Sequence, residues 1–169
     1  MIVHVRLDER LIHGQVATSW IRYYDANAVV IPSDIIATSD IDKMALRLAA
    51  SMIADLKLSI VCIKDAIRIL NDPRCKPLKI MVVCRTPQDV LCIVQNVPEI
   101  PEINLANYGD QIKKDATIVR SLGALKSLRL REEDVEYVRQ ILALGIPCWV
   151  QKAVEERKTI LSLDMLNND

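Results

Sequence analysis

The sequence has 169 residues, of which 51% are hydrophobic and 4% aromatic, with no phenylalanine. This length predicts one domain over residues 1–169 with an aliphatic core, and the balance of 22 basic against 22 acidic residues points to neither nucleic acid nor an acidic membrane surface. No apolar run approaches the roughly 18 to 20 residues that span a bilayer, so we expect a soluble, cytoplasmic protein. The five cysteines are odd in number, lack a CxxC pair and lie mostly in apolar runs, as is typical of reduced core residues.

Strand and helix patterns alternate along the whole chain. Apolar runs predict strands at residues 1–5, 28–32, 57–62, 79–84, 103–106, 127–130 and 146–150, with a further edge strand at 116–119. Amphipathic runs predict helices at residues 15–24, from 39 onward, and at 65–70, 86–96, 132–144 and 159–166. Such alternation is typical of a largely parallel α/β sandwich with right-handed crossovers.

Two of these helices begin at clear capping signals. Ser39 has an aspartate three residues later, a variant of the capping box, and Met44, Leu48 and Met52 then recur on one face of the helix. Thr86 is followed by proline at the first helical position and by an acid in the first turn, which predicts Thr86 as an N-cap.

Polar residues follow three of the predicted strands. Residues 8–13 come after the first strand, Ser33 and Asp34 after the second, and Arg85 and Thr86 after the fourth. Ligands of open α/β sheets bind beyond the carboxyl ends of the strands, at a switch in strand order. We therefore expect all three loops to open on one edge of the sheet.

The first of these loops carries the most informative chemistry. It joins the first strand to the first helix and holds Arg6, Arg10 and His13 beside Gly14. The free N–H groups of a first helical turn and the helix dipole favour anions at such a place. A neutral imidazole there can attack phosphorus, and arginines can neutralise phosphoryl oxygens.

A simpler interpretation of the same stretch remains open at this point. Ile12, Val16, Trp20 and Tyr24 fall four apart, so the helix could begin near Asp8. His13 would then be half exposed on the side of the helix, and the arginines would form solvated ion pairs.

The gapless run of residues 6–16, Arg-Leu-Asp-Glu-Arg-Leu-Ile-His-Gly-Gln-Val, is followed by Ala-Thr and then Trp20. This run resembles the signature of the enzyme IIB subunits of the bacterial phosphoenolpyruvate:sugar phosphotransferase system, mannose/fructose/sorbose class. Ser33-Asp34 with the helix after it, and residues 86–90, also look like family segments, so the resemblance extends over nearly the full length.

The resemblance implies a three-layer α/β/α sandwich around a mostly parallel central sheet, in which an edge strand can be antiparallel. It also implies that the δ1 nitrogen of His13 is phosphorylated by a IIA partner and that the group then passes to a sugar delivered by membrane IIC and IID subunits. The protein would be cytoplasmic and peripherally associated with that permease, and the transfer would require no metal or other cofactor.

Four residues of the loop are candidates to assist this phosphoryl transfer. Arg10 is the first candidate to stabilise the transferring group; its alternative is a solvated pair with a neighbouring acid. Arg6 could act from below or only extend along the strand end. Gly14 could let the backbone approach phosphate, or serve only as a turn glycine, and Gln15 beside it joins the phosphate-supporting set.

Three further candidates have more than one interpretation. Asp8 could orient the imidazole or hold Arg10 in place. Asp34 could do the same or cap a turn. Thr86 could donate a hydroxyl to phosphate, but its N-cap role already explains it and is the favoured interpretation.

Two other features bear on the interior and on the family resemblance. His4 lies inside a predicted strand and, with Trp20 and Tyr24, is expected in the interior. Where the family usually carries Asn-x-Gly-Gly-Met after the fifth strand, this chain has Ala106 and Asn107 in place of the two glycines. Asn tolerates a positive φ and Ala does not, so we expect a reshaped turn that bears on partner docking or on the identity of the sugar system.

Two other functional hypotheses follow from the sequence. One is a regulatory or binding module on the same fold, phosphorylated at His13 but not coupled to sugar transport. The other, a nucleotide-binding enzyme, is disfavoured because the four glycines form neither a G-x-G-x-x-G nor a Walker pattern. Mannose, fructose, sorbose and amino sugars all remain open as substrates, and a homo-oligomer is compatible with the sequence.

Overall fold

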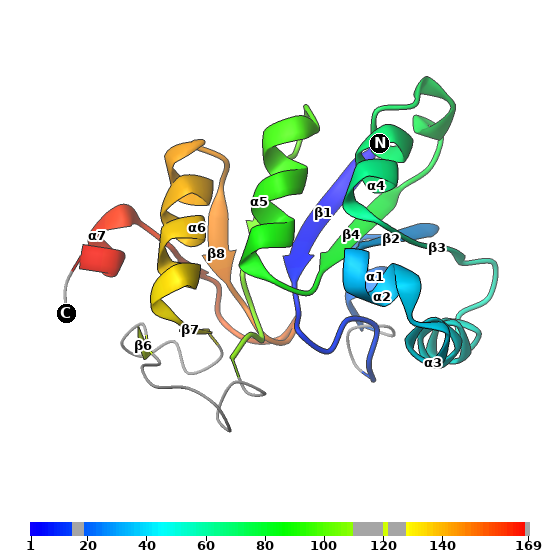
Figure 1. The fold of residues 1–169 in the computed structure, drawn as a ribbon, viewed down its shortest axis with the longest axis horizontal. Helices are drawn as coiled ribbons and strands as arrows, with labels where there is room; N and C mark the ends of the chain where they lie inside the picture. Colours follow the sequence, from blue (N-terminus) through cyan, green and yellow to red (C-terminus); the bar gives the residue numbers. More distant parts are fainter. Residues whose placement is uncertain (15–18, 110–119, 122–127, 168–169) are drawn as a thin grey trace.

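The computed structural model describes residues 1–14, 19–109, 120–121 and 128–167. A seven-stranded sheet in the order β3-β2-β4-β1-β5-β8-β9 forms its centre (Figure 1). All neighbouring strands of this sheet are parallel except the edge strand β9, which is antiparallel to β8. Its strands are β1 (Ile2–Leu7), β2 (Ala28–Pro32), β3 (Lys57–Val61), β4 (Ile80–Cys84), β5 (Ile103–Asn104), β8 (Cys148–Val150) and β9 (Thr159–Ile160).

Helices cover both faces of the sheet. One apolar cluster packs β-strand residues such as Val30 and Val82 against α4, α5, α6 and α7, and the other packs their neighbours Val29 and Met81 against α1, α2 and α3. The predicted α/β/α sandwich is therefore confirmed. The helices are α1 (Ile21–Tyr23), α2 (Asp34–Thr38), α3 (Asp40–Ala50), α4 (Ile63–Leu70), α5 (Pro87–Asn96), α6 (Glu132–Ala143) and α7 (Leu163–Asn167), with a 3-10 turn at Pro73–Cys75.

The central strands show why this architecture forms. Every residue of β2 and of β4 is buried, as is expected of parallel strands covered by helices on both faces. From β1 the chain moves outward to β2 and β3, returns to β4, and then crosses to β5 on the other side of β1. The order of the strands switches at β1, so the loop after β1 lies where such folds bind their ligands.

The predicted caps are confirmed. The Ser39 hydroxyl accepts a hydrogen bond from the Asp42 backbone N–H at 3.3 Å and begins α3. Thr86 and Asp89 form a capping box at the start of α5, with Pro87 at the first helical position. The serine of the Ser33-Asp34 pair caps the short helix α2 in the same way.

The structure corrects several predicted boundaries. The helix predicted at residues 159–166 is wrong at its start, because Thr159 and Ile160 form β9 along the edge of β8 and a helix begins only at Leu163. The strand predicted at 127–130 is shorter, and β7 (Arg129–Leu130) pairs with β6 (Arg120–Ser121) in a separate ribbon. The predicted edge strand 116–119 lies outside the described residues, as does the start of the predicted helix 15–24.

His4 is an interior residue, as predicted. It is fully buried in β1, its Nδ1 is hydrogen-bonded to Glu102 Oε1 at 3.0 Å, and its ring stacks on Tyr24 with centroids 4.2 Å apart. The Tyr24 hydroxyl donates to the same carboxylate. Burial lowers the pKa of His4 below its ordinary value, against the opposing effect of Glu102. Trp20 is also buried.

Within the described residues, no helix combines the length and apolar character needed to cross a lipid bilayer.

Candidate functional site

The loop that follows β1 rests on a buried ion pair. Arg6 is fully buried, and its Nε and Nη2 donate to Asp8 Oδ2 at 3.3 and 3.1 Å. Its Nη1 and Nη2 also donate to the backbone carbonyls of Gln151 (3.2 Å) and Lys152 (3.1 Å), and the guanidinium lies 4.9 Å from the ring centroid of Trp20. Every nitrogen of this guanidinium has a partner inside the fold, so Arg6 supports the loop and does not present its charge at the surface.

Asp8 connects this ion pair to the loop backbone. Its Oδ1 accepts from the Arg10 backbone N–H at 3.2 Å and from Asn107 Nδ2 at 2.7 Å. Of the two roles considered for Asp8, these contacts match holding Arg10 in place, through its backbone. Burial raises the pKa of Asp8, an effect that Arg6 and the hydrogen bonds from Asn107 and Arg10 oppose.

The loop is not the beginning of a helix. Leu11 has a φ of 57° and its backbone N–H donates to the Asp8 carbonyl at 2.9 Å, which closes a tight turn over residues 8–11. Leu11 and Ile12 are buried in the cluster that packs α1, α2 and α3 against the sheet. The alternative in which a helix begins near Asp8 is therefore wrong for residues 8–14.

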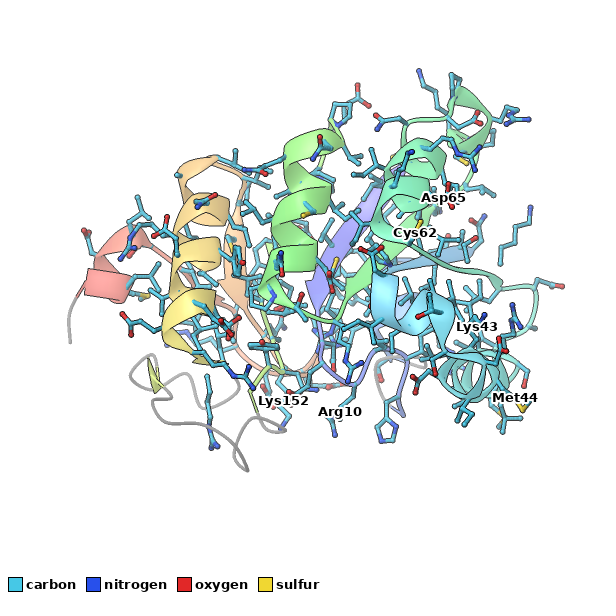
Figure 2. The ribbon with its side chains drawn as sticks, in the orientation of Figure 1. Arg10, Lys43, Met44, Cys62, Asp65 and Lys152 are labelled. Carbon is cyan, nitrogen blue, oxygen red and sulfur yellow. The ribbon has the colours of Figure 1, made fainter. Side chains whose placement is uncertain are left out.

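The alternation of buried and exposed residues in this loop directs two side chains outward. Leu11 and Ile12 point into the core, whereas Arg10 before them and His13 after them are exposed. Figure 2 shows Arg10 projecting from the lower edge of the molecule, below β1. Arg10 forms no side-chain hydrogen bond or ion pair with any other residue that the structure describes. Its predicted alternative, a pair with Glu9 or Asp8, is thus not observed.

A cleft of about 410 Å³ opens beside His13. Arg10 and His13 line it from the loop, Arg85 from the end of β4, and Ala45 and Ala49 from α3. Arg85 is half-buried and, like Arg10, has no hydrogen bond or ion pair to another described residue. One imidazole and two guanidinium groups that form no ion pair with a described residue therefore border the same space, which the side chains of Glu9 and Asp42 also line.

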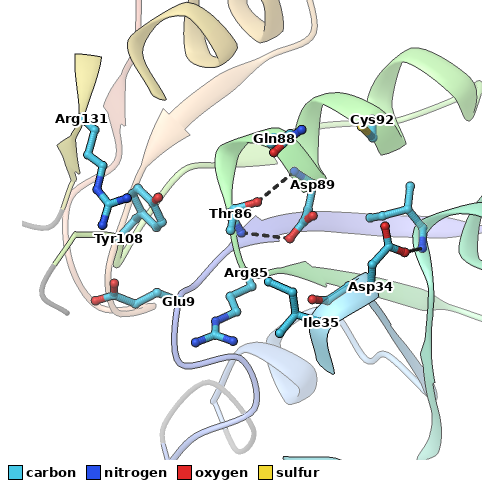
Figure 3. A pocket seen from close by; sticks show the side chains of 12 residues that line it. Glu9, Asp34, Ile35, Arg85, Thr86, Gln88, Asp89, Cys92, Tyr108 and Arg131 are labelled. Atoms are coloured by element: carbon cyan, nitrogen blue, oxygen red, sulfur yellow. Dashed lines mark hydrogen bonds between the residues drawn. The ribbon is translucent and has the colours of Figure 1, made fainter. Parts of the chain in front are cut away.

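A second cavity, of about 700 Å³, lies on the other side of Arg85 (Figure 3). It holds Asp34 and Thr86 but not His13. The Asp34 Oδ1 accepts from the Ile63 backbone N–H at 2.9 Å at the start of α4, and the Thr86 hydroxyl accepts from the Asp89 N–H at 3.1 Å. Both residues therefore cap helices, and neither borders the cleft beside His13.

The carboxylate of Asp89 has an unusual titration in this second cavity. Burial raises its pKa to about 6 and the nearby Asp34 adds to the shift, while hydrogen bonds from Thr86 and the charge of Arg85 oppose it. Asp89 thus carries a proton more readily than an ordinary aspartate near neutral pH.

The turn after β5 contributes to the loop through Asn107. Asn107 has a φ of 60°, in the left-handed region, whereas Ala106 is not among the residues of positive φ. The backbone carbonyl of Asn107 accepts from the Glu9 N–H at 3.1 Å, in addition to the side-chain bond to Asp8. Asparagine therefore supplies the backbone conformation of a glycine and also fixes the loop that carries His13.

The two remaining residues of the predicted set are Gly14 and Gln15. Gly14 is exposed with a φ of 46°, and a Cβ added there would meet nothing within 4 Å, which fits a turn glycine. Gln15 lies outside the described residues.

The sequence analysis placed Arg85 only among the polar residues that follow a strand, and did not select Arg85 or Asn107 for the site. For Arg85, the available signal was its position directly after a buried strand and before an N-cap. Asn107 could be linked to Asp8 only once the fold was known, because 99 positions separate them.

Comparison with known proteins gives a consistent result. Residues 2–168 match the family model described as the PTS system sorbose subfamily IIB component, where PTS denotes the phosphotransferase system. A probable phosphotransferase enzyme IIB component of Streptococcus pyogenes is 32% identical over 144 residues, which cover 85% of this chain and 86% of that protein. The sorbose-specific EIIB component of Lacticaseibacillus casei is 30% identical over 146 residues, covering 86% and 84%.

Two further relatives extend the comparison. The mannose-specific EIIAB component of Escherichia coli is 28% identical over 153 residues, which cover 90% of this chain but 45% of that protein. The crystal structure of the IIBSor domain of the sorbose permease from Klebsiella pneumoniae superimposes with a TM-score of 0.85 at 24% identity, covering 99% of this chain and 96% of that one. The match to the family model over almost the entire chain shows that this protein belongs to the sorbose subfamily of phosphotransferase-system IIB components.

Proposed function

We propose that His13 of this IIB component accepts a phosphoryl group from the phosphohistidine of a IIA donor and passes it to a sugar that is being taken up. Family membership implies phosphoryl transfer in sugar uptake; the residues and the sequence of partners are our proposal. The observation that carries it is the exposed His13 imidazole, which shares one cleft with the guanidinium groups of Arg10 and Arg85.

The reaction proceeds in two displacements at phosphorus. In the first, the lone pair of a ring nitrogen of His13, assigned as Nδ1 by the family resemblance, forms a P–N bond while the P–N bond to the donor histidine breaks. In the second, a sugar hydroxyl attacks the same phosphorus while the bond to His13 breaks. The electron pair of that bond returns to the ring nitrogen, and the proton of the hydroxyl passes to the imidazole that leaves. Each step requires a neutral attacking group in line with the bond that breaks.

Charge stabilisation would come from the two arginines. The transferring group spreads its negative charge over three equatorial oxygens, and donors already in place cost no reorganisation when that charge develops. Arg10 is anchored through its backbone by Asp8, and Arg85 by the end of β4. Both can meet the phosphoryl oxygens without first breaking an ion pair to a described residue.

Two kinds of partner follow from this proposal. The EIIAB relative is named as a joined IIA and IIB component, which supports a IIA protein as the donor. Membrane IIC and IID subunits would deliver the sugar, so residues 1–169 would act as a single cytoplasmic domain that meets the permease at the membrane surface.

Transfer of labelled phosphate tests the assignment. The protein incubated with a phosphorylated IIA donor should gain acid-labile label that maps to His13, and His13→Ala should gain none while keeping the wild-type unfolding temperature. Full labelling of His13→Ala would overturn the proposal.

A second step separates transport from regulation. Addition of membrane vesicles that contain IIC and IID subunits, with sugar, should move the label from His13 to sugar phosphate. Label that stays on the protein with every sugar tested would instead favour the regulatory module.

A further inference from the structure

Helix α3 exposes an unusual row of large apolar side chains. Ile41, Met44 and Leu48 are 83%, 72% and 71% exposed, and Met52, just after the helix, is 81% exposed. Successive helical residues are about 100° apart, so the three helical members of this row fall within about 60° of one another. In Figure 2, Met44 points outward from α3, on the side away from the sheet. We call these four residues the α3 stripe.

The α3 stripe does not contribute to the core of this chain. The opposite side of the helix packs on the sheet through Leu46 and Ala50, which are buried. Solvated helices normally carry polar residues on their outer face, and a contiguous exposed apolar patch marks a surface that another molecule covers.

The stripe adjoins the cleft beside His13. Ala45 lies four residues after Ile41 and Ala49 lies one residue after Leu48, so both alanines occupy the next positions around the helix, and both line that cleft. Small side chains at these two positions leave a low rim between the α3 stripe and the reactive imidazole. The apolar row and the cleft therefore form one continuous surface.

The geometry of phosphoryl transfer places a protein on this surface. A donor must bring its phosphorus to roughly 3–3.5 Å from the attacking nitrogen, and a specific protein interface covers about 800 Å² on each partner, a disc of about 16 Å radius. The eleven residues of α3 span about 16 Å at 1.5 Å per residue. A donor centred on His13 would therefore extend over the helix that forms the rim of its cleft.

We propose that the α3 stripe is the apolar part of the docking surface for the phosphohistidine-bearing donor protein, whose complementary face would be apolar around its own histidine. This inference rests on the proposed function. Methionine and leucine side chains adapt to a partner that must bind and leave within each cycle. The EIIAB relative, in which a IIA component is joined to a IIB component in one chain, supports the donor as the occupant.

The charges beside the stripe fit a protein partner better than a lipid surface. Asp40 and Asp42 balance Lys43 and Arg47 on α3, and Lys43 is paired with Asp40 at 2.8 Å. Binding to an anionic membrane would need an excess of basic residues on the polar face of the helix. A second copy of this chain on the stripe would block access to His13, which the transfer requires.

A charge placed on the stripe tests the proposal. Met44→Glu and Leu48→Glu, singly and together, should raise the donor concentration needed for half-maximal transfer to His13 by about tenfold or more, with the maximal rate unchanged within about twofold. Met44→Leu should behave as wild type. Ile160 is 75% exposed on the edge strand β9, and Ile160→Glu is the matched control that should change neither quantity.

Direct binding separates this inference from the proposed function. His13→Ala should bind the unphosphorylated donor as the wild type does, measured by calorimetry, whereas the double stripe variant should bind about tenfold more weakly or not at all. Unchanged binding and transfer in the double variant would overturn the docking surface while His13 labelling persists. If the wild type is never labelled, the proposed function fails instead, whatever the stripe binds.

The other occupants give distinct results. A double variant that takes phosphate normally from the donor but transfers it more slowly to sugar in permease vesicles would assign the stripe to the membrane subunits and overturn the donor proposal. A concentration-dependent dimer in sedimentation that the double variant abolishes would assign it to a second copy and overturn the proposal too. Thermal unfolding of each variant should match wild type within a few degrees, because the changed side chains are exposed.

Discussion

Two arginines four positions apart, Arg6 in β1 and Arg10 in the loop that follows it, have opposite environments. Arg6 is fully buried, and each nitrogen of its guanidinium donates to Asp8 or to a backbone carbonyl from the far end of the chain. Arg10 is exposed and has no ion pair among the residues that the structure describes. Arg6 thus gives structural support to the loop, whereas Arg10 carries an exposed charge that no described residue neutralises.

The difference shows how a small domain holds a reactive group in position. A buried ion pair contributes little net stability, since desolvation offsets its attraction, but removal of one partner leaves an unpaired buried charge. The pair of Arg6 and Asp8 is therefore better understood as fixing the loop geometry. In the proposed reaction, the loop would then present Arg10 and His13 to the phosphoryl group without further ordering.

The largest expected effect follows from removing one partner of the buried ion pair between Arg6 and Asp8. Asp8→Ala leaves the Arg6 guanidinium buried without its carboxylate and should lower the free energy of unfolding by about 3–5 kcal/mol, measured by urea denaturation. Asp8→Ala should also lose most phosphoryl acceptance, because the Arg10 backbone loses its anchor. If Asp8→Ala has the free energy of unfolding of the wild type, the buried ion pair is not needed for folding.

The next effect concerns Arg10 and Arg85, and their substitution should leave the stability of the fold unchanged. Arg10→Ala and Arg85→Ala should each lower the maximal rate of phosphoryl acceptance by about 10²-fold, the cost typical of removing one donor from a developing anion, measured by rapid quench with labelled donor. Their free energies of unfolding should stay within about 0.5 kcal/mol of wild type. Unchanged rates in both variants would show that neither arginine stabilises the transferring group.

A third test addresses Asn107, which links the turn after β5 to Asp8. Asn107→Gly keeps the left-handed backbone but removes the 2.7 Å hydrogen bond to Asp8, and should lower the free energy of unfolding by about 1.5–3 kcal/mol, as for bonds to charged groups. Asn107→Ala should cost more, since alanine also resists a positive φ. Equal stability of the alanine and glycine variants would exclude the backbone contribution.

The smallest expected effect is a pH dependence of the free energy of unfolding that arises from His4 in β1. Burial lowers the pKa of His4 in the folded protein, so below the unfolded value of about 6.5 the unfolded chain binds more protons and stability falls as the pH falls. The slope reaches at most about 1.4 kcal/mol per pH unit. Between pH 7.5 and 6, His4→Gln should therefore show a shallower loss of stability than wild type in urea titrations.

A second titrating group must be taken into account in that measurement. Asp89, with its pKa raised to about 6, contributes a change of opposite sign equally to the wild type and to His4→Gln. Parallel curves for His4→Gln and wild type would show that His4 has no influence on stability over this range.

The strands and helices could be predicted where the local sequence pattern matches the way the segment packs in the fold. The runs that became β2 and β4 are apolar throughout because helices cover both faces, and Thr86 carries its own capping partner three residues later. Thr159 and Ile160 were assigned to a helix because the pairing of β9 with β8 depends on a strand end elsewhere in the chain.

The candidate site residues could be selected from a motif in the sequence, but their geometry could not. The sequence indicated His13 and Arg10, but it could not show that Arg6 is held by carbonyls 145 and 146 positions later. The same holds for Arg85, whose approach to His13 depends on β4 lying beside β1. The pattern of Met44, Leu48 and Met52 placed them on one face, and only the packing of α3 shows that this face is exposed.

The order of the strands also bears on how the protein matures on the ribosome. The loop over residues 8–14 gains its hydrogen bond from Asn107 only after that residue has emerged, and the Arg6 guanidinium beneath the loop is fully paired only after Gln151 and Lys152 have followed. A nascent or truncated chain that ends before residue 151 would carry its histidine on an unsupported loop. The proposed acceptor site would therefore be complete only after Lys152 has emerged, so chains that stop earlier would not accept phosphate in the proposed reaction.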